Sequence, residues 1–154
     1  MTFGNQYATQ TQAYSSELRG GYAVTWVIFA DAPIVYPRVI NTDILVAQAQ
    51  DAVQRFAGTL KKDGTLLLDS DTVTDVPAVK AKKYAIAATS IARQQFSAPI
   101  VANIIMLGAL TKVHAVTGRQ DLEKAIAAAV PKNKVDMNLK AFAAGFDMVK
   151  PCGS

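Results

Sequence analysis

The sequence of 154 residues contains a single cysteine, Cys152, and a single histidine, His114. One thiol cannot close an internal disulfide, and it cannot alone hold an iron–sulfur cluster or a structural zinc ion. A Ser–His–Asp or Cys–His arrangement would have only one possible base, and no acid stands three or four positions from His114. We therefore interpret His114 as a core or interface residue, and we predict that the isolated chain is catalytically inactive.

Long hydrophobic runs are also missing. The longest apolar stretch, residues 99–110, has about twelve residues and is too short to cross a bilayer. The first ten residues show neither the basic region nor the apolar run of a secretory signal. No Walker loop and no Gly-x-Gly-x-x-Gly motif occurs. The sequence predicts a cytoplasmic protein without a membrane span.

The composition is that of a folded domain, with 51% hydrophobic and 18% charged residues. It excludes disorder and suggests that some apolar surface meets a partner. The net charge is +4, and the excess of cations lies in the middle of the chain, beside predicted strands that have no interleaved aromatic residues. We expect a solvated rim here and no nucleic-acid surface. Its lysines are Lys61, Lys62, Lys80, Lys82 and Lys83.

Short apolar runs alternate with stretches of helical spacing. The predicted strands are 22–29, 43–47, 65–68 and 83–88, with an extended segment at 5–11 before them. The predicted helices are 48–60, 89–96, 99–116, 121–130 and 138–149. This order predicts an α/β fold, a single three-layer domain over residues 1–154 with a mostly parallel sheet and flanking helices. We expect 44–47 and 65–68 to be central and the 99–116 helix to be buried.

Several residues are predicted to end or begin these elements. Residues 62–64 form a turn into a strand, Gly118 closes a long helix, and Asn138 caps the last one. Thr89 or Ser90 can cap the helix that follows the fourth strand.

Three aspartates, Asp69, Asp71 and Asp75, are spaced as in a metal-binding loop. The glycine and terminal glutamate of a calcium loop are absent, so we interpret the aspartates as loop and capping residues.

A polar loop precedes the first strand. It brings hydroxyl groups, a guanidinium and flexible backbone N–H groups together, which is the chemistry that binds an anion. Arg19 is its only cation and the only one in the first 37 residues. The alternative is a turn in which Arg19 pairs with Glu17, a close neighbour in sequence, and only holds the shape of the loop. Its candidate binding residues are Tyr14, Ser15, Ser16, Arg19, Gly20 and Gly21.

Asn103 is predicted to lie within the apolar 99–116 helix, where an unpaired amide would cost about 1–3 kcal/mol. Its side chain either caps a neighbouring loop or points into a ligand or partner.

Residues 14–21, YSSELRGG, resemble the Tyr-Gly-Pro-Glu-x-Arg-Gly-Gly loop of the gamma subunit of 2-oxoacid:ferredoxin oxidoreductases. The resemblance continues in order through 42–47, 60–70, 102–110 and 138–146, and so covers nearly the whole chain. Two departures stand out. Ser15-Ser16 replaces the usual Gly-Pro, and the family's first strand with its Gly-x-Gly-Gly-Gln-Gly turn has no counterpart here. If the chain is complete, the sheet lacks a strand, and a partner must cover the edge that this exposes.

The resemblance implies a role in a multi-subunit enzyme. Members of the family decarboxylate a 2-oxoacid on thiamine diphosphate with Mg²⁺, pass electrons through iron–sulfur clusters to ferredoxin or another acceptor, and deliver the acyl group to coenzyme A. The resemblance implies that this chain alone binds no cofactor and has partners of the alpha, beta and delta types. It also implies that Tyr14, Ser15, Ser16, Arg19, Gly20 and Gly21 lie nearest the phosphates of coenzyme A. The family has Ala-Asn at the position of Asn103 too, which fits a binding role and a capping role alike. Which 2-oxoacid is used stays open, as do a purely structural assembly role and an unrelated α/β ligand-binding module.

Overall fold

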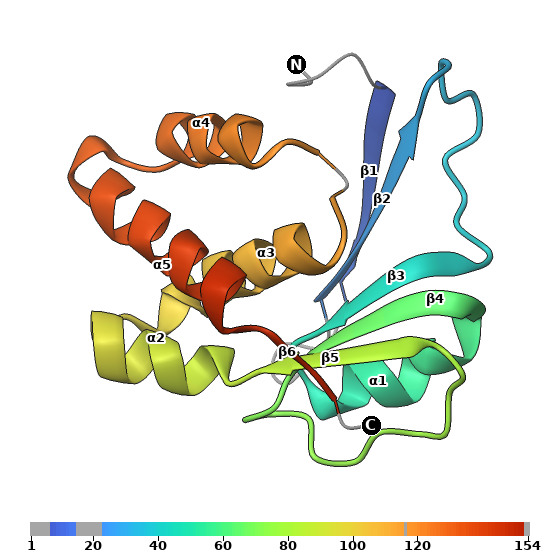
Figure 1. Ribbon diagram of the computed structural model, residues 1–154. Coiled ribbons are helices and arrows are strands. Elements are labelled where there is room, and N and C mark those ends of the chain that lie inside the picture. The colour runs from blue at the N-terminus through green and yellow to red at the C-terminus, as the bar shows by residue number, and fades with distance from the viewer. Residues whose placement is uncertain (1–6, 15–22, 116, 153–154) are drawn as a thin grey trace. The chain divides into compact units, whose positions relative to one another are not determined.

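The computed structural model describes residues 7–14, 23–115 and 117–152 (Figure 1). The chain divides into two compact units, Met1–Asn41 and Thr42–Ser154. The assignment of residues 1–154 to one domain stays a prediction.

Two antiparallel strands, β1 (Tyr7–Tyr14) and β2 (Ala23–Ala30), make up the regular structure in the described part of the first unit. The side chains of β2 alternate in exposure, and Val24, Trp26 and Ile28 are on the less exposed side. The predicted strand is therefore confirmed, and the extended segment before it is a paired strand.

A four-stranded sheet in the order β3-β4-β5-β6 lies in the second unit. The first three strands are parallel, and β6 is antiparallel to β5. The mostly parallel sheet is thus confirmed. The strands are β3 (Thr42–Ala47), β4 (Leu60–Asp69), β5 (Lys82–Ile86) and β6 (Lys150–Pro151).

The strand β3 stands first in this order, and among the described residues it pairs only with β4. The prediction that 44–47 and 65–68 are both central is right for β4 and wrong for β3. An apolar run reports that both faces of a strand are covered. It does not report whether a second strand lies beside it.

The helices cover both faces of the sheet, with α1 on one face and α2, α3 and α5 on the other (Figure 1). Because successive side chains of β4 point to opposite faces, Leu66 and Leu68 pack with Val53 of α1, whereas Leu67 packs with Ile105 of α3. The predicted three layers are confirmed. The helices are α1 (Gln50–Phe56), α2 (Ala88–Phe96), α3 (Ala102–Val113), α4 (Arg119–Ala129) and α5 (Val135–Met148). Short 3₁₀ turns occur at Ala57–Thr59, Pro99–Val101 and Lys132–Lys134.

Helices α3 and α5 are in backbone contact. A Cβ atom on Gly108 would collide with the carbonyl oxygen of Phe142, and one on Gly145 would collide with the carbonyl oxygen of Ile105. Ile105 and Phe142 are both fully buried at this crossing. The predicted burial of the long apolar helix is therefore confirmed along its α5 side.

The turn predicted at residues 62–64 is wrong. These residues lie within β4, whose register against β3 shifts between Thr42 and Ile44. A Cβ atom at Gly64 would stand 2.9 Å from the carbonyl oxygen of Asp43, so the glycine allows a close backbone approach at this irregularity. A glycine after charged residues is typical of a turn and of a bulge alike.

Two predicted helix boundaries are also wrong. Gly118 precedes α4, and its carbonyl accepts a hydrogen bond from the N–H of Asp121 at 3.1 Å, whereas α3 ends at Val113. Asn138 is not an N-cap, because the 3₁₀ turn before α5 runs directly into the helix. Its buried Nδ2 instead donates to the carbonyl of Lys134 at 2.8 Å. Glycine occurs at both ends of helices, so its position alone does not tell a start from an end. Asparagine is a common N-cap residue, and the sequence alone does not distinguish an N-cap from a position inside the first turn.

Candidate functional site

The predicted anion-binding loop falls between β1 and β2 in sequence. Tyr14 is the last residue of β1 and is paired with Ala23. The role of the loop in binding coenzyme A therefore stays a prediction. The site residues that lie outside the described part of the chain are Ser15, Ser16, Arg19, Gly20 and Gly21.

Asn103 lies in the first turn of α3 and has an exposed side chain. Its Oδ1 accepts a hydrogen bond from the N–H of Ile104 at 2.8 Å. Of the two alternatives for Asn103, the cap of a neighbouring loop is wrong, because the side-chain oxygen bonds to the start of its own helix. The exposed position keeps it accessible to a ligand or partner.

Asp69 is the centre of a polar network at the carboxyl end of β4. Its side chain is 1% exposed, and Oδ2 accepts the hydroxyl of Thr89 at 2.6 Å and the N–H of Thr89 at 3.1 Å. Its Oδ1 accepts the N–H of Asp71 at 3.1 Å. The carboxylate of Asp71 in turn accepts the N–H of Ser90 at 2.6 Å and its hydroxyl at 2.9 Å.

These two aspartates fasten the first turn of α2 to the end of the sheet. The capping interpretation of Asp69 and Asp71 is confirmed. The prediction that Thr89 or Ser90 is the N-cap is wrong, because both lie inside the first turn, where they act as donors, and the N-cap position is Ala87. Carboxylates placed here satisfy N–H groups that have no partner within a helix.

Gln50, at the start of α1, holds the loop that follows β4. Its Oε1 accepts the N–H groups of Thr74 at 2.9 Å and Asp75 at 3.0 Å. The hydroxyl of Thr72 donates to the carbonyl of Gln48 at 3.1 Å. Sequence analysis did not identify Gln50, since nothing in its neighbourhood distinguishes it from a solvated glutamine. This edge of the sheet, where α/β proteins often bind ligands, is thus fastened by internal hydrogen bonds.

An open pocket of about 440 Å³ lies where β5 meets the C-terminal segment. Lys83, Tyr84 and Cys152 are among its lining residues, and the N–H of Cys152 donates to the carbonyl of Lys83 at 2.8 Å. Burial raises the pKa of the Cys152 thiol, while the nearby charge of Lys83 acts in the opposite direction. A thiol held in its neutral form is a poor nucleophile.

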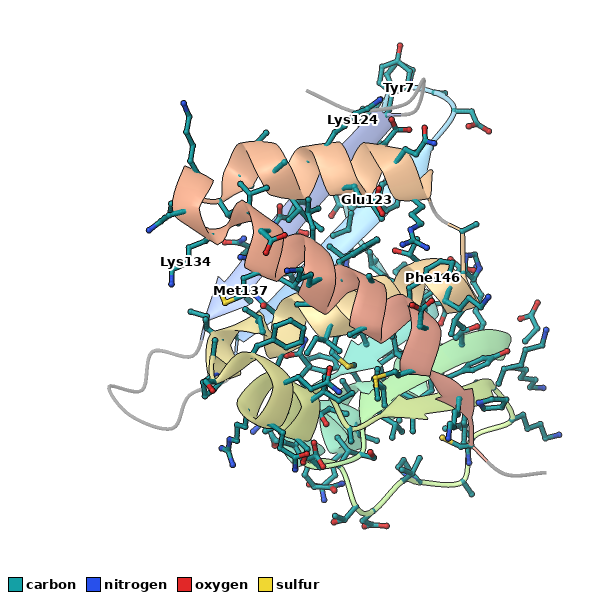
Figure 2. The ribbon with its side chains drawn as sticks, turned by 60° about the vertical axis from the view of Figure 1, so that its left-hand side comes forward. Tyr7, Glu123, Lys124, Lys134, Met137 and Phe146 are labelled. Carbon is teal, nitrogen blue, oxygen red and sulfur yellow. The ribbon has the colours of Figure 1, made fainter. Side chains whose placement is uncertain are left out.

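Two cations lie against one aromatic ring where α3, α4 and α5 meet. The Nζ of Lys112 is 4.9 Å from the ring centroid of Phe146, and the guanidinium carbon of Arg119 is 4.5 Å from it. Arg119 also donates to Glu123 of α4 at 2.8 Å; Figure 2 labels Phe146 and Glu123. These cation–π contacts link the end of α3 and the start of α4 to the last turns of α5.

His114 follows α3 directly and is exposed, so the prediction of a core histidine is wrong and an interface role stays a prediction. Across residues 7–14, 23–115 and 117–152, no three His, Cys, Asp or Glu side chains are grouped to hold a metal ion. Lys61 of the predicted basic rim is exposed and forms a 2.6 Å ion pair with Asp43, which raises the pKa of the lysine through a hydrogen bond and its charge. No helix in the described part of the chain is long and apolar enough to cross a membrane.

Comparison with known proteins gives consistent results. The family described as pyruvate ferredoxin/flavodoxin oxidoreductase matches residues 3–148. The 2-oxoglutarate synthase subunit KorC of Methanocaldococcus jannaschii is 42% identical over 150 residues, which cover 96% of this chain and 80% of the relative.

Solved structures agree with these sequence matches. The gamma subunit of a keto/oxoacid ferredoxin oxidoreductase from Geobacter sulfurreducens aligns with a TM-score of 0.80 and 34% identity, over 92% of this chain and 79% of that one. A 2-oxoglutarate:ferredoxin oxidoreductase from Magnetococcus marinus, solved with 2-oxoglutarate, coenzyme A and succinyl-CoA bound, aligns with a TM-score of 0.77 at 17% identity. There the match covers 92% of this chain but only 25% of the other, so the same fold is part of a longer polypeptide.

Proposed function

Because this chain belongs to the pyruvate ferredoxin/flavodoxin oxidoreductase family, we propose that it is the gamma-type subunit of a CoA-acylating 2-oxoacid oxidoreductase. The complex converts a 2-oxoacid and coenzyme A to an acyl-CoA and CO₂ and passes two electrons to ferredoxin or a similar acceptor. The observation that carries the proposal is the match of nearly the whole chain to a named subunit at 42% identity. That subunit's name favours 2-oxoglutarate as the substrate.

The chemistry of decarboxylation is assigned to other subunits. Thiamine diphosphate needs Mg²⁺, and the clusters need several thiolates. The described residues of this chain do not fit either group, since they contain one cysteine and no set of metal ligands. The two aspartates nearest the sheet edge are already bonded to the first turn of α2. We therefore propose partners of the alpha, beta and delta types that supply these sites in the cytoplasm.

The contribution of this chain is on the coenzyme A side. Coenzyme A supplies the thiol that takes the acyl group, and its phosphates are the part that a cationic loop can hold. The donors of the 14–21 loop fit phosphate, since a guanidinium and hydroxyls give charge-assisted hydrogen bonds about twice as strong as neutral ones. In this role Arg19 binds and orients coenzyme A, and Asn103 offers a second, exposed amide.

Replacing Arg19 tests this role directly. In an assembled complex, Arg19→Ala removes a charged contact with a net value of about 1.5–3 kcal/mol, so the KM for coenzyme A should rise roughly ten- to a hundredfold. The KM for the 2-oxoacid should stay unchanged. Steady-state kinetics with both substrates measure the difference.

Arg93→Ala is the matched control, because Arg93 is an exposed arginine on α2. It should leave both KM values unchanged. Equal effects of Arg19→Ala on both substrates, or no effect, would show that Arg19 only shapes its loop through Glu17. Dissociation of the complex would show that the chain has a purely structural assembly role.

A further inference from the structure

Exposed hydrophobic side chains are concentrated in one short part of the chain. Of the eight large hydrophobic residues that are exposed among the described residues, six lie in the first unit, and only Ile100 and Met148 lie in the much longer second unit. Single exposed hydrophobic residues are normal on a protein surface, but a concentration of them marks a surface that meets another molecule. The six are Tyr7, Val27, Phe29, Val35, Tyr36 and Ile40.

Five of these residues lie in the second half of β2 and in the connection from β2 to β3. We call these five the apolar segment: Val27, Phe29, Val35, Tyr36 and Ile40. The last three are the most exposed, at 93% for Val35, 74% for Tyr36 and 73% for Ile40. Aromatic residues such as Phe29 and Tyr36 are enriched in the buried centres of protein interfaces, and these centres are more apolar than the rest of the surface.

The strand part of the apolar segment lies on a face without charge. Val27 is opposite Gln10, and Phe29 is opposite Ala8, so these four side chains share one face of the β1–β2 pair. An uncharged face does not favour nucleic acid or a strongly acidic partner. It suits an apolar protein surface.

The backbone of the connection part is restricted by two prolines and one hydrogen bond. Pro33 and Pro37 stand on either side of Val35 and Tyr36, and proline fixes the φ angle of its own residue. The N–H of Arg38 also donates to the carbonyl of Tyr36 at 2.9 Å. Exposed side chains on a restrained backbone lose less conformational freedom on binding, which favours a specific interface.

We propose that the apolar segment is the surface on which a non-identical subunit of the oxidoreductase docks, an inference that rests on the proposed function. The same fold occupies one quarter of a longer chain in the Magnetococcus marinus enzyme, where it is covalently joined to other parts of the enzyme. That arrangement favours a different polypeptide as the occupant over a second copy of this chain. The partner surface is apolar and carries little charge.

The test uses the assembled complex and single aspartate substitutions. Tyr36→Asp and Val35→Asp each place a charge in the proposed interface, and each should weaken binding of the chain to its partner subunits by about tenfold or more. Tyr36→Phe retains the apolar ring and should bind as the wild type does. Ile100→Asp is the matched control, since Ile100 is 81% exposed but lies in the second unit. Binding is measured by titrating the tagged chain against the purified remaining subunits, and circular dichroism checks that each variant is folded.

Selective weakening by Tyr36→Asp and Val35→Asp, with Tyr36→Phe and Ile100→Asp unaffected, supports the proposal. Unchanged binding by both aspartate variants overturns it and leaves the proposed function intact. Loss of self-association of the isolated chain, without loss of subunit binding, overturns it in favour of a second copy. If the wild-type chain itself does not bind the other subunits, the proposed function fails and this inference fails with it.

Discussion

Replacing Gly108 with alanine should strongly destabilise the second unit. The new methyl group would collide with the Phe142 carbonyl of α5, and a backbone atom cannot move aside as the end of a flexible side chain can. A Cβ at Gly108 would lie 1.9 Å from that oxygen, so the two helices would have to separate by roughly 1.5 Å to restore ordinary contact, which loosens the core between them. We expect a loss of about 3 kcal/mol in the free energy of unfolding, at the upper end for overpacked cores.

Denaturation followed by far-ultraviolet circular dichroism measures this loss, which corresponds to a fall of roughly 10 °C in Tm for a unit of this size. Gly58→Ala is the matched control, because no atom lies within 4 Å of a Cβ placed at Gly58. It should be neutral or stabilise by up to about 1 kcal/mol, because alanine restricts the unfolded chain. Equal stability of the Gly108→Ala and Gly58→Ala variants would refute the close packing of α3 on α5.

Two further changes test the polar sites. Asp69→Asn removes the charge and one of the two acceptor oxygens that bond to Thr89 and Asp71, and should lower the free energy of unfolding by about 2–4 kcal/mol, while the same change at exposed Asp71 should cost less than about 1 kcal/mol. Similar losses in chemical denaturation would contradict the buried network. Because burial raises the pKa of the Cys152 thiol and Lys83 opposes this, alkylation at pH 8 should be slower in the folded than in the unfolded protein and slower still in Lys83→Ala. A faster reaction in Lys83→Ala would count against the proposed electrostatic effect.

The order of strands and helices could be predicted because each element carries its own periodicity. The apolar runs at β3 and β4 and the helical stripes between them reported burial on both faces. That information is local to the sequence. A loop and capping role for Asp69 and Asp71 could be predicted because the other ligands of a calcium loop are missing, but the helix that they cap, 20 and 19 residues later in the chain, could not.

Features that depend on distant partners could not be predicted. Gly64 allows the backbone of β4 to come close to Asp43 of β3. Which strand pairs with β3 depends on the whole sheet. The contact of Gly108 with α5 requires knowing which helices cross. Gln50 accepts hydrogen bonds from the loop residues 24 and 25 positions later in the chain. No periodicity or motif in the sequence predicts a contact over that separation.

The residues of the candidate site predict less than the periodicity of the helices and strands does. Family resemblance identified the loop with Arg19, whereas the anion-binding chemistry of its residues alone did not distinguish a binding loop from a turn. Of the predicted site residues, only Asn103 is described together with its side chain, and it proved to be exposed and bonded within its own helix.

The central claim is that this chain is a necessary subunit of a 2-oxoacid oxidoreductase. The most direct measurement is the CoA-dependent reduction of an electron acceptor by the remaining subunits with 2-oxoglutarate, before and after the purified chain is added back. We predict that neither the chain alone nor the remaining subunits alone sustain turnover, and that mixing them restores it. Full activity without the chain, or turnover by the chain alone, would contradict this assignment.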